Sequence, residues 1–258
     1  MRTAISSATP GLGNRIKTYV SLMSKFDTVK TCRESDTLLF RNLEKVNDGD
    51  VNSLPIFDGW RLEVSSDEEK YIEKYKTIDF LYEKTPSYFI DKYIKVFSRL
   101  DINPEIKYEV EKFSQSWEDT IGLHVRSWYC QRNSWHNLSL FEEQINSLQK
   151  DLKIFLCTDN LNVYEYFLSK YEDRIIKYPQ TLYNTILKAE TGYNYNTLDN
   201  INSLIDMILL SKCKTIIGTF ASSFSECAWW FSGCKSKMLI SLPPNVPQEF
   251  LDDIFLLK

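Results

Sequence analysis

The sequence has few of the residues on which metal sites, disulfide scaffolds and membrane spans depend. Its 258 residues include two histidines, His124 and His136, and six cysteines that form no C-x-x-C pair. This spacing argues against a Cys/His metal site, and we expect free thiols of a reducing compartment. No apolar run reaches the roughly 18 residues that a transmembrane helix needs, and the N-terminus has no apolar signal-peptide core. We therefore expect a cytoplasmic protein without a membrane-spanning segment.

The chain also has no basic excess. It carries 31 Lys and Arg against 35 Asp and Glu, a net charge of −4, and this balance argues against general nucleic-acid binding. Aromatic residues, in contrast, are plentiful, with 15 Tyr, 15 Phe and 6 Trp. Such side chains build large cores and also form the walls of sugar and base pockets, and composition does not separate these uses. Composition also leaves the oligomeric state open.

Strands and helices alternate regularly in the second half of the chain. We predict strands at 120–126, 152–158, 174–177, 214–219 and 237–242, and helices at 138–150, 161–171, 200–212, 223–231 and 247–257. This alternation predicts a parallel sheet with helices on both faces. The strands are near-continuous apolar runs, as expected for a sheet that is covered on both sides.

The first half is less regular. A strand at Thr3–Ser6 leads through a glycine loop into a helix whose apolar face extends to Phe26. Further on, we predict strands at 37–41 and 59–64 and helices at 66–75, 87–100 and 104–116. The pattern changes near 116–120, which predicts an N-terminal domain at 1–118 and a C-terminal domain at 119–258. The last helix of the chain can pack back on the N-terminal domain.

Residues 214–230 couple an apolar strand directly to a helix start rich in small polar residues. Ser223 and Glu226 fit an S-x-x-E capping box that opens this helix. A helix N-terminus at the carboxyl end of a parallel strand offers N–H groups to an anion. Thr219, Ser222 and Ser223 add hydroxyls at the same place. The segment is therefore a candidate phosphate site, and an ordinary capped turn is the alternative.

The glycine loop near the N-terminus is a second candidate for binding an anion. Gly11, Gly13, Asn14 and Arg15 lie between the first strand and the first helix, where backbone N–H groups can approach a ligand closely. The loop has neither the third glycine of a dinucleotide fingerprint nor the lysine of a P-loop. A plain strand-to-helix turn therefore stays open as its interpretation.

A third candidate lies at the end of the strand at 120–126. Period-two alternation puts His124 and Arg126 on one face, where the strand meets the ligand-binding edge of the sheet. An arginine there can bind a phosphate through two hydrogen bonds. The alternatives are a structural histidine and a surface ion pair. The acidic D-x-D at Asp48 and Asp50 can hold a metal in other proteins, but its N-D-G-D sequence favours a turn.

The order of these motifs resembles the GDP-fucose-dependent fucosyltransferases of the GT-B fold. The resemblance rests on G-x-G-N-R, H-x-R, L-x-T-D at 156–159, L-I-D-M-x-L-L-S-x-C at 204–213 and G-T-F-x-S-S-F-S at 218–225. It is strongest to the bacterial nodulation and animal core α-1,6-fucosyltransferases. It implies an α/β fold of GT-B type, with two Rossmann-like parallel-sheet domains that face a cleft and a reduced N-terminal domain.

The resemblance also implies roles for individual residues. Arg126 corresponds to the arginine that holds the β-phosphate of GDP. His124 and Asp206 correspond to the residues that contact the guanine end. Asp159 corresponds to an aspartate that lines the nucleotide pocket. Ser222, with Ser223 and Thr219 beside it, corresponds to the serine that binds phosphate.

The implied activity is inverting, metal-independent transfer of fucose from the donor GDP-fucose to a glycan acceptor, without a cofactor. One departure bears on the chemistry, because no Asp or Glu lies between Asp119 and Glu142, where some relatives carry a carboxylate. His136 is the nearest candidate base, and Arg132 can supply a second cation. Another nucleotide sugar as donor, or a catalytically inactive module that binds a nucleotide or sugar, stays open.

Overall fold

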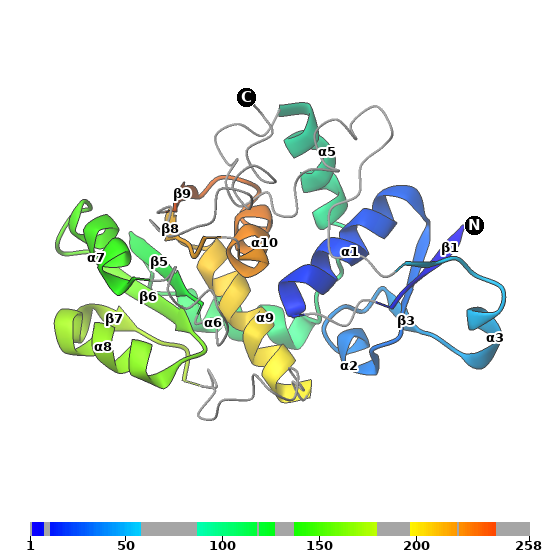
Figure 1. Cartoon of the computed structure of the whole chain (residues 1–258), viewed down its shortest axis with the longest axis horizontal. Helices are drawn as coiled ribbons and strands as arrows, with labels where there is room; N and C mark the ends of the chain where they lie inside the picture. Colours follow the sequence, from blue (N-terminus) through cyan, green and yellow to red (C-terminus); the bar gives the residue numbers. More distant parts are fainter. Residues whose placement is uncertain are drawn as a thin grey trace.

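A computed structural model shows an α/β chain with two parallel sheets on either side of a central group of helices (Figure 1). It describes residues 2–7, 11–57, 87–117, 119–126, 137–179, 197–220 and 222–240. The elements that the sequence predicts at 59–64, 66–75 and 247–257 lie outside these ranges. Among the described residues, no helix combines the length and the apolar character needed to cross a bilayer.

The N-terminal sheet has four described strands in the order β3-β2-β1-β4, all parallel. The strands are β1 (Thr3–Ser6), β2 (Thr28–Thr31), β3 (Leu43–Lys45) and β4 (Ile56–Phe57). The described helices between its strands are α1 (Leu12–Lys25), α2 (Glu34–Thr37) and α3 (Asp48–Val51). The predicted helix after the glycine loop is confirmed, and it buries Ile16, Tyr19, Val20 and Met23.

The C-terminal sheet has five described strands in the order β7-β6-β5-β8-β9, again all parallel. The strands are β5 (Thr120–Val125), β6 (Lys153–Thr158), β7 (Ile175–Ile176), β8 (Thr215–Ile217) and β9 (Lys237–Leu239). Helices α7 (Leu138–Asn146) and α8 (Leu161–Tyr171) pack on one face, and a short 3₁₀ helix, η2 (Glu172–Arg174), follows α8. Helices α9 (Thr197–Ser211) and α10 (Ser223–Phe231) pack on the other face. The predicted parallel sheet with helices on both sides is confirmed.

The two sheets share one strand order. In each half the first strand lies inside, the second and third strands pair outward on one side, and the fourth strand pairs on the other side. In the C-terminal sheet the chain passes from β5 to β6 on one side and from β8 to β9 on the other, and open α/β sheets bind ligands at such a switch point. In the C-terminal sheet this position lies between β5 and β8, where the sequence places two of its three anion-binding candidates.

The strand predicted at 37–41 is wrong. Residues Glu34–Thr37 form α2, and Phe40 makes only an isolated antiparallel bridge to Ile102. Leu39 and Phe40 are both fully buried, and their backbone N–H groups donate to the Asp36 carbonyl oxygen in turns instead of to a neighbouring strand. The apolar pair anchors a turn under α1, and the third strand begins only at Leu43.

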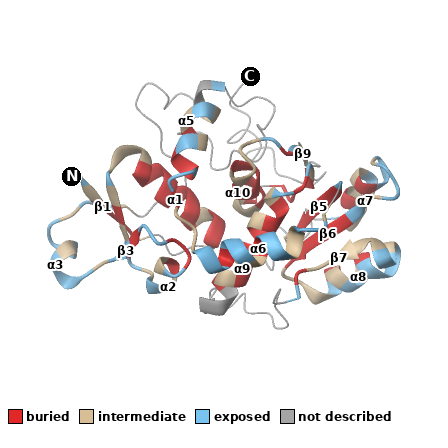
Figure 2. Cartoon of the chain, turned by 180° about the vertical axis from the view of Figure 1, so that it is seen from behind, coloured by how far each residue is buried: buried red, intermediate tan, exposed pale blue. Residues whose placement is uncertain are grey.

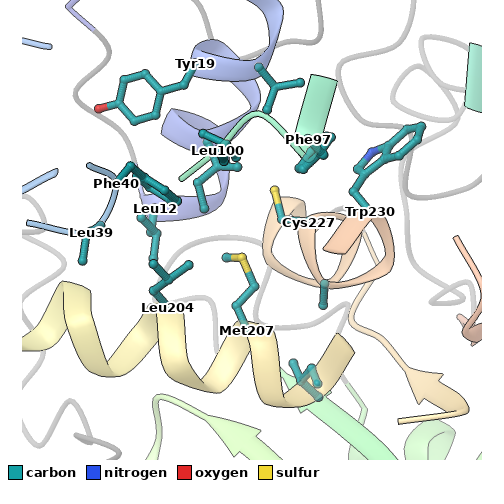
Figure 3. Packing of buried hydrophobic residues seen from close by; sticks show 14 of the residues in the cluster. Leu12, Tyr19, Leu39, Phe40, Phe97, Leu100, Leu204, Met207, Cys227 and Trp230 are labelled. Atoms are coloured by element: carbon teal, nitrogen blue, oxygen red, sulfur yellow. The ribbon is translucent and has the colours of Figure 1, made fainter. Parts of the chain in front are cut away.

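A large apolar core fills the space between the two sheets, where Figure 2 shows buried residues on α1, α9 and α10. Helix α5 (Ser87–Phe97) also enters this core, and α6 (Pro104–Ser114) packs against α9. Figure 3 shows Leu12 and Tyr19 from α1, Leu204 and Met207 from α9, and Trp230 from α10 around one shared interior. The core therefore belongs to both halves of the chain. No disulfide joins the five cysteines in the described ranges, Cys32, Cys157, Cys213, Cys227 and Cys234.

Thr219 joins the carboxyl ends of β5 and β8. Its fully buried side chain accepts a hydrogen bond from the Arg126 backbone N–H at 2.8 Å and donates one to the His124 carbonyl oxygen, also at 2.8 Å. Parallel strands diverge after their last ladder bond, so this hydroxyl extends the pairing beyond the sheet. Both hydrogen bonds end on residues that the sequence assigns to ligand binding.

We expect Thr219→Val to lower the free energy of unfolding by about 1–3 kcal/mol, because the methyl group leaves a buried donor and a buried acceptor unpaired. Thr219→Ser keeps the hydroxyl and should retain most of the stability. Urea unfolding followed by tryptophan fluorescence measures the difference. Thr37→Val is the matched control, since it removes an exposed hydroxyl that donates to the Glu34 carbonyl oxygen. An equal loss in both valine variants would contradict the role given to Thr219.

Candidate functional site

His124 is held against the first turn of α10. The residue is 4% exposed, its Nδ1 lies 2.7 Å from the Ser225 hydroxyl, and its ring stacks on Phe224 with the centroids 4.8 Å apart. The ring therefore has a fixed orientation at the carboxyl end of β5. Sequence reasoning placed His124 at this edge but missed Phe224 and Ser225, although both belong to the G-T-F-x-S-S-F-S motif.

Arg126 lies one residue beyond β5, and its guanidinium forms an ion pair with Asp159, which follows β6. The two side chains keep 20% and 17% of their surface exposed, so the pair stands at the boundary between the sheet and solvent. A guanidinium offers several N–H groups in a planar fork, which suits a phosphate as well as a carboxylate. The structure thus brings two of the predicted ligand residues into contact at one end of the sheet.

Asp206 enters the same region from α9, with 4% of its surface exposed. Cys157 on β6, which the sequence analysis did not single out, pairs in register with His124. Burial raises the pKa of the Cys157 thiol well above its ordinary value, and the carboxylates of Asp206 and Asp159 raise it further, while Arg126 lowers it. The thiol therefore stays protonated at neutral pH. Asp206, Asp159 and Arg126 all lie close enough to the Cys157 thiol to affect its pKa.

Helix α10 begins at this edge of the sheet. Its N-cap is Ser222, which is 4% exposed and makes no side-chain capping bond. The predicted capping box of Ser223 and Glu226 is wrong, because Ser223 is already the first helical residue. The Glu226 carboxylate is fully buried and binds Lys17 of α1, with Nζ and Oε2 2.6 Å apart. The first turn of α10 thus keeps its backbone N–H groups clear of a side-chain cap, which is what an anion site requires.

The two glycines of the N-terminal loop have different surroundings. Gly11 is the N-cap of α1, and a Cβ added there would meet no atom within 4 Å. A Cβ added to Gly13 would lie 2.8 Å from Ser223 carbonyl and hydroxyl atoms. Gly13 is therefore required for close contact between α1 and α10, while Gly11 faces open space. Asn14 follows in the first turn and is half-buried.

Arg15 is buried between α2 and α9. It is fully buried, and its guanidinium makes two hydrogen bonds to the Asp36 carboxylate, at 2.7 and 3.0 Å, and one to the Asn200 side chain of α9, at 2.9 Å. The Tyr19 hydroxyl also donates to Asp36. Burial and the Asp36 charge raise the pKa of Tyr19 far above its ordinary value. This geometry gives Arg15 a structural role.

His136 lies outside the described residues, as do Arg132 and the stretch 127–130 after Arg126. The candidate base is therefore not placed relative to the other residues. The described parts of the site come from both halves of the chain and meet where α1 and α10 touch. At the carboxyl ends of β5, β6 and β8 and the start of α10, the structure brings together Gly13, His124, Arg126, Asp159, Thr219, Ser222 and Ser223. Asp206 of α9 lies close enough to Cys157 of β6 to raise the pKa of its thiol.

The N-D-G-D sequence forms the capped start of the short helix α3, where the sequence predicts a turn. Asn47 caps α3, and the Asp50 carboxylate accepts from the Asn47 N–H at 2.9 Å and from Lys30 Nζ at 2.9 and 3.0 Å. These two donors lower the pKa of Asp50. Over the ranges that the structure describes, no group of three or more His, Cys, Asp or Glu residues is arranged to hold a metal ion.

Comparison with known proteins gives results only at the level of structure. No protein-family model matches the chain, and no curated protein sequence is significantly similar to it. Among solved structures, the chain is similar to the fucosyltransferase NodZ from Bradyrhizobium, with a TM-score of 0.55, 18% identity, and coverage of 88% of this chain and 91% of that one. NodZ α-1,6-fucosyltransferase co-crystallised with GDP gives a TM-score of 0.54, 20% identity, and coverage of 88% and 91%.

A mutant of Arabidopsis thaliana FUT1 in complex with GDP is also similar, with a TM-score of 0.52, 13% identity, and coverage of 96% of this chain and 73% of that one. At these identities the likeness is one of fold. The chain has the α/β fold of GT-B type that these fucosyltransferases share, and the fold predicted from the sequence motifs is confirmed.

Proposed function

We propose that this protein is an inverting glycosyltransferase that transfers fucose from GDP-fucose to a hydroxyl group of a glycan. The observation that carries the proposal is the meeting, at the β5–β8 edge, of three groups that are suited to bind an anion. Thr219 holds Arg126 beside the start of α10, and Gly13 brings the glycine loop of α1 against the same helix turn. A diphosphate is the ligand that suits a guanidinium beside two helix N-termini. NodZ, which shares the fold, was co-crystallised with GDP.

The donor would lie across the carboxyl ends of β5 and β8. In this placement Arg126 binds the β-phosphate, and the first turn of α10 at Ser222 and Ser223, with Gly11, Gly13 and Asn14 of the loop, surrounds the diphosphate. His124 and Asp206 would contact the guanine end, and Asp159 would line the pocket while it orients Arg126. Arg15 supports the glycine loop from within the core.

The transfer needs charge stabilisation at the leaving group more than any other assistance. The acceptor oxygen forms a bond to the anomeric carbon while the bond from that carbon to the β-phosphate oxygen breaks, and the electron pair leaves with GDP. The growing negative charge falls where Arg126 and the N–H groups of α10 are already oriented, so no reorganisation is needed during the reaction. The acceptor proton passes to a base, for which His136 remains the candidate.

The proposed mechanism uses no metal ion, because the groups named above already supply positive charge to the diphosphate. The structure supports this part through Asp50, whose carboxylate caps α3 and binds Lys30. We also propose a cytoplasmic location, which the lack of disulfides among the described cysteines favours. An inactive module that binds a nucleotide or sugar is the alternative, because the chain carries no carboxylate between Asp119 and Glu142.

The first test is nucleotide binding. We expect GDP at a hundredfold excess over its Kd to raise the melting temperature by about 5–10 °C, since a ligand that binds only the folded chain stabilises it by mass action. A thermal-shift panel of GDP, UDP, TDP and CMP measures the preference. A larger shift with UDP or TDP would rule out the proposed donor. Release of GDP from GDP-fucose in the presence of glycan acceptors then separates an enzyme from a binding module.

The second test concerns Arg126. Arg126→Ala should leave the protein folded and reduce the transfer rate at least about a hundredfold, because the charge acts mainly on the leaving group in the transition state. Arg126→Lys should restore little, since a point charge does not reproduce the guanidinium fork. Arg41→Ala is the control, because it removes an exposed arginine whose Nε lies 3.6 Å from Asp101. Full activity of Arg126→Ala would place the diphosphate elsewhere.

The third test concerns metal ions. EDTA should leave transfer activity nearly unchanged, and the double variant Asp48→Asn/Asp50→Asn should keep it as well. A metal-dependent enzyme that holds its donor through a D-x-D pair would lose activity in both experiments. EDTA and the double variant would each remove the cation that stabilises the leaving group. The assay compares initial rates with EDTA alone and with EDTA plus excess Mn²⁺. Activity lost in EDTA and restored by Mn²⁺ would contradict the proposed mechanism.

A further inference from the structure

The contact between α1 and α10 contains an ion pair that the proposed chemistry does not use directly. The Lys17 and Glu226 side chains are 2% and 0% exposed, and Nζ and Oε2 lie 2.6 Å apart. Glu226 Oε1 also accepts from the Trp230 indole N–H at 3.3 Å. Removing two charges from water costs several kcal/mol, and a well-packed apolar pair is often as stable. Stability alone therefore does not explain a buried ion pair at this position, where the pair can affect the alignment of the two helices.

The contacts show what the ion pair aligns. Gly13 and Ser223, in the first turn of each helix, are in direct contact, and the Cys227 thiol lies 3.4 Å from the Gly13 carbonyl oxygen. Lys17 lies one turn after Gly13, and Glu226 lies about one turn after Ser223, so the two N-termini are at the same end of the contact. Each N-terminus carries a partial positive charge. Two like ends side by side repel each other unless an anion lies before them both.

We propose that Lys17 and Glu226 are positioning residues that hold the glycine loop and the start of α10 together, so that the two N-termini bind one diphosphate jointly. This inference rests on the proposed function, because it assigns the diphosphate to both helices. The pair touches no part of the ligand. It acts through the helix contact, and Gly13 permits the approach that the pair fixes.

The test uses the double variant Lys17→Met/Glu226→Gln. It removes both charges of the Lys17–Glu226 pair and keeps a side-chain oxygen for the Trp230 indole. We expect the variant to fold, as judged by thermal unfolding. It should bind GDP and inorganic pyrophosphate about tenfold more weakly than the wild type. A tenfold loss lies in the upper range of the binding energy that one helix N-terminus contributes to an anion. Guanosine has no phosphate, so its affinity should stay within about twofold. Calorimetry measures GDP and pyrophosphate, and an NMR titration measures guanosine.

The matched control is Lys30→Met/Asp50→Asn. This pair lies within the N-terminal half, with Nζ and Oδ2 2.9 Å apart, and does not touch α10. Its removal should leave all three affinities unchanged. An unchanged affinity of the Lys17/Glu226 variant for GDP would overturn the inference, as would a parallel loss of guanosine and GDP binding. Both results would assign the pair to general stability.

The failure of the proposed function gives a different result. If the wild type binds pyrophosphate but no guanine nucleotide, the donor assignment fails, and the pyrophosphate measurements still decide the role of the ion pair. If the wild type binds neither pyrophosphate nor any nucleotide, both the proposed function and this inference are wrong.

Discussion

The approach of α1 to α10 is the constraint on which the rest of the structure depends. It is possible only because residue 13 is a glycine, since a side chain there would collide with Ser223. The contact places the first turn of α1, from the N-terminal half, beside the first turn of α10, from the C-terminal half, and the candidate site takes residues from both turns. The strand ends alone would present Arg126 and His124 without the second half of the site.

Charged groups in the interior define this arrangement further. Arg15 bonds to Asp36 of its own half and to Asn200 of the other, and Lys17 binds Glu226 across the same boundary. An apolar core alone tolerates small shifts of one helix along another, but hydrogen bonds between buried charges are satisfied in few positions. The two halves are therefore fixed relative to each other by polar contacts, although most of the buried area between them is apolar.

Sequence reasoning succeeded where one helix or strand determines its own pattern. The apolar runs of β5, β6 and β8 and their alternation with helices gave correct elements with small errors in their bounds. Strands β2 and β3 were missed because they are short and contain charged residues, TVKT and LEK. The capping box of Glu226 and the ligand role of Arg15 failed for a related reason. Both side chains bind partners that are far away in the sequence, Lys17 and Asp36, and no local pattern reveals such pairs.

The interior between the sheets also bears on how such a chain can be divided. Helix α5 comes from the N-terminal half of the chain, yet Phe97 stacks on Trp230 of α10 with the ring centroids 5.4 Å apart, and Tyr93 packs on the same indole. The core between the two sheets contains residues from both halves of the chain. A chimera that exchanged the C-terminal half for that of another protein of this fold would expose α1 and α5 unless it rebuilt their partners on α9 and α10. Exchange of one half alone, which many two-domain folds permit, would therefore break the packing of this shared interior.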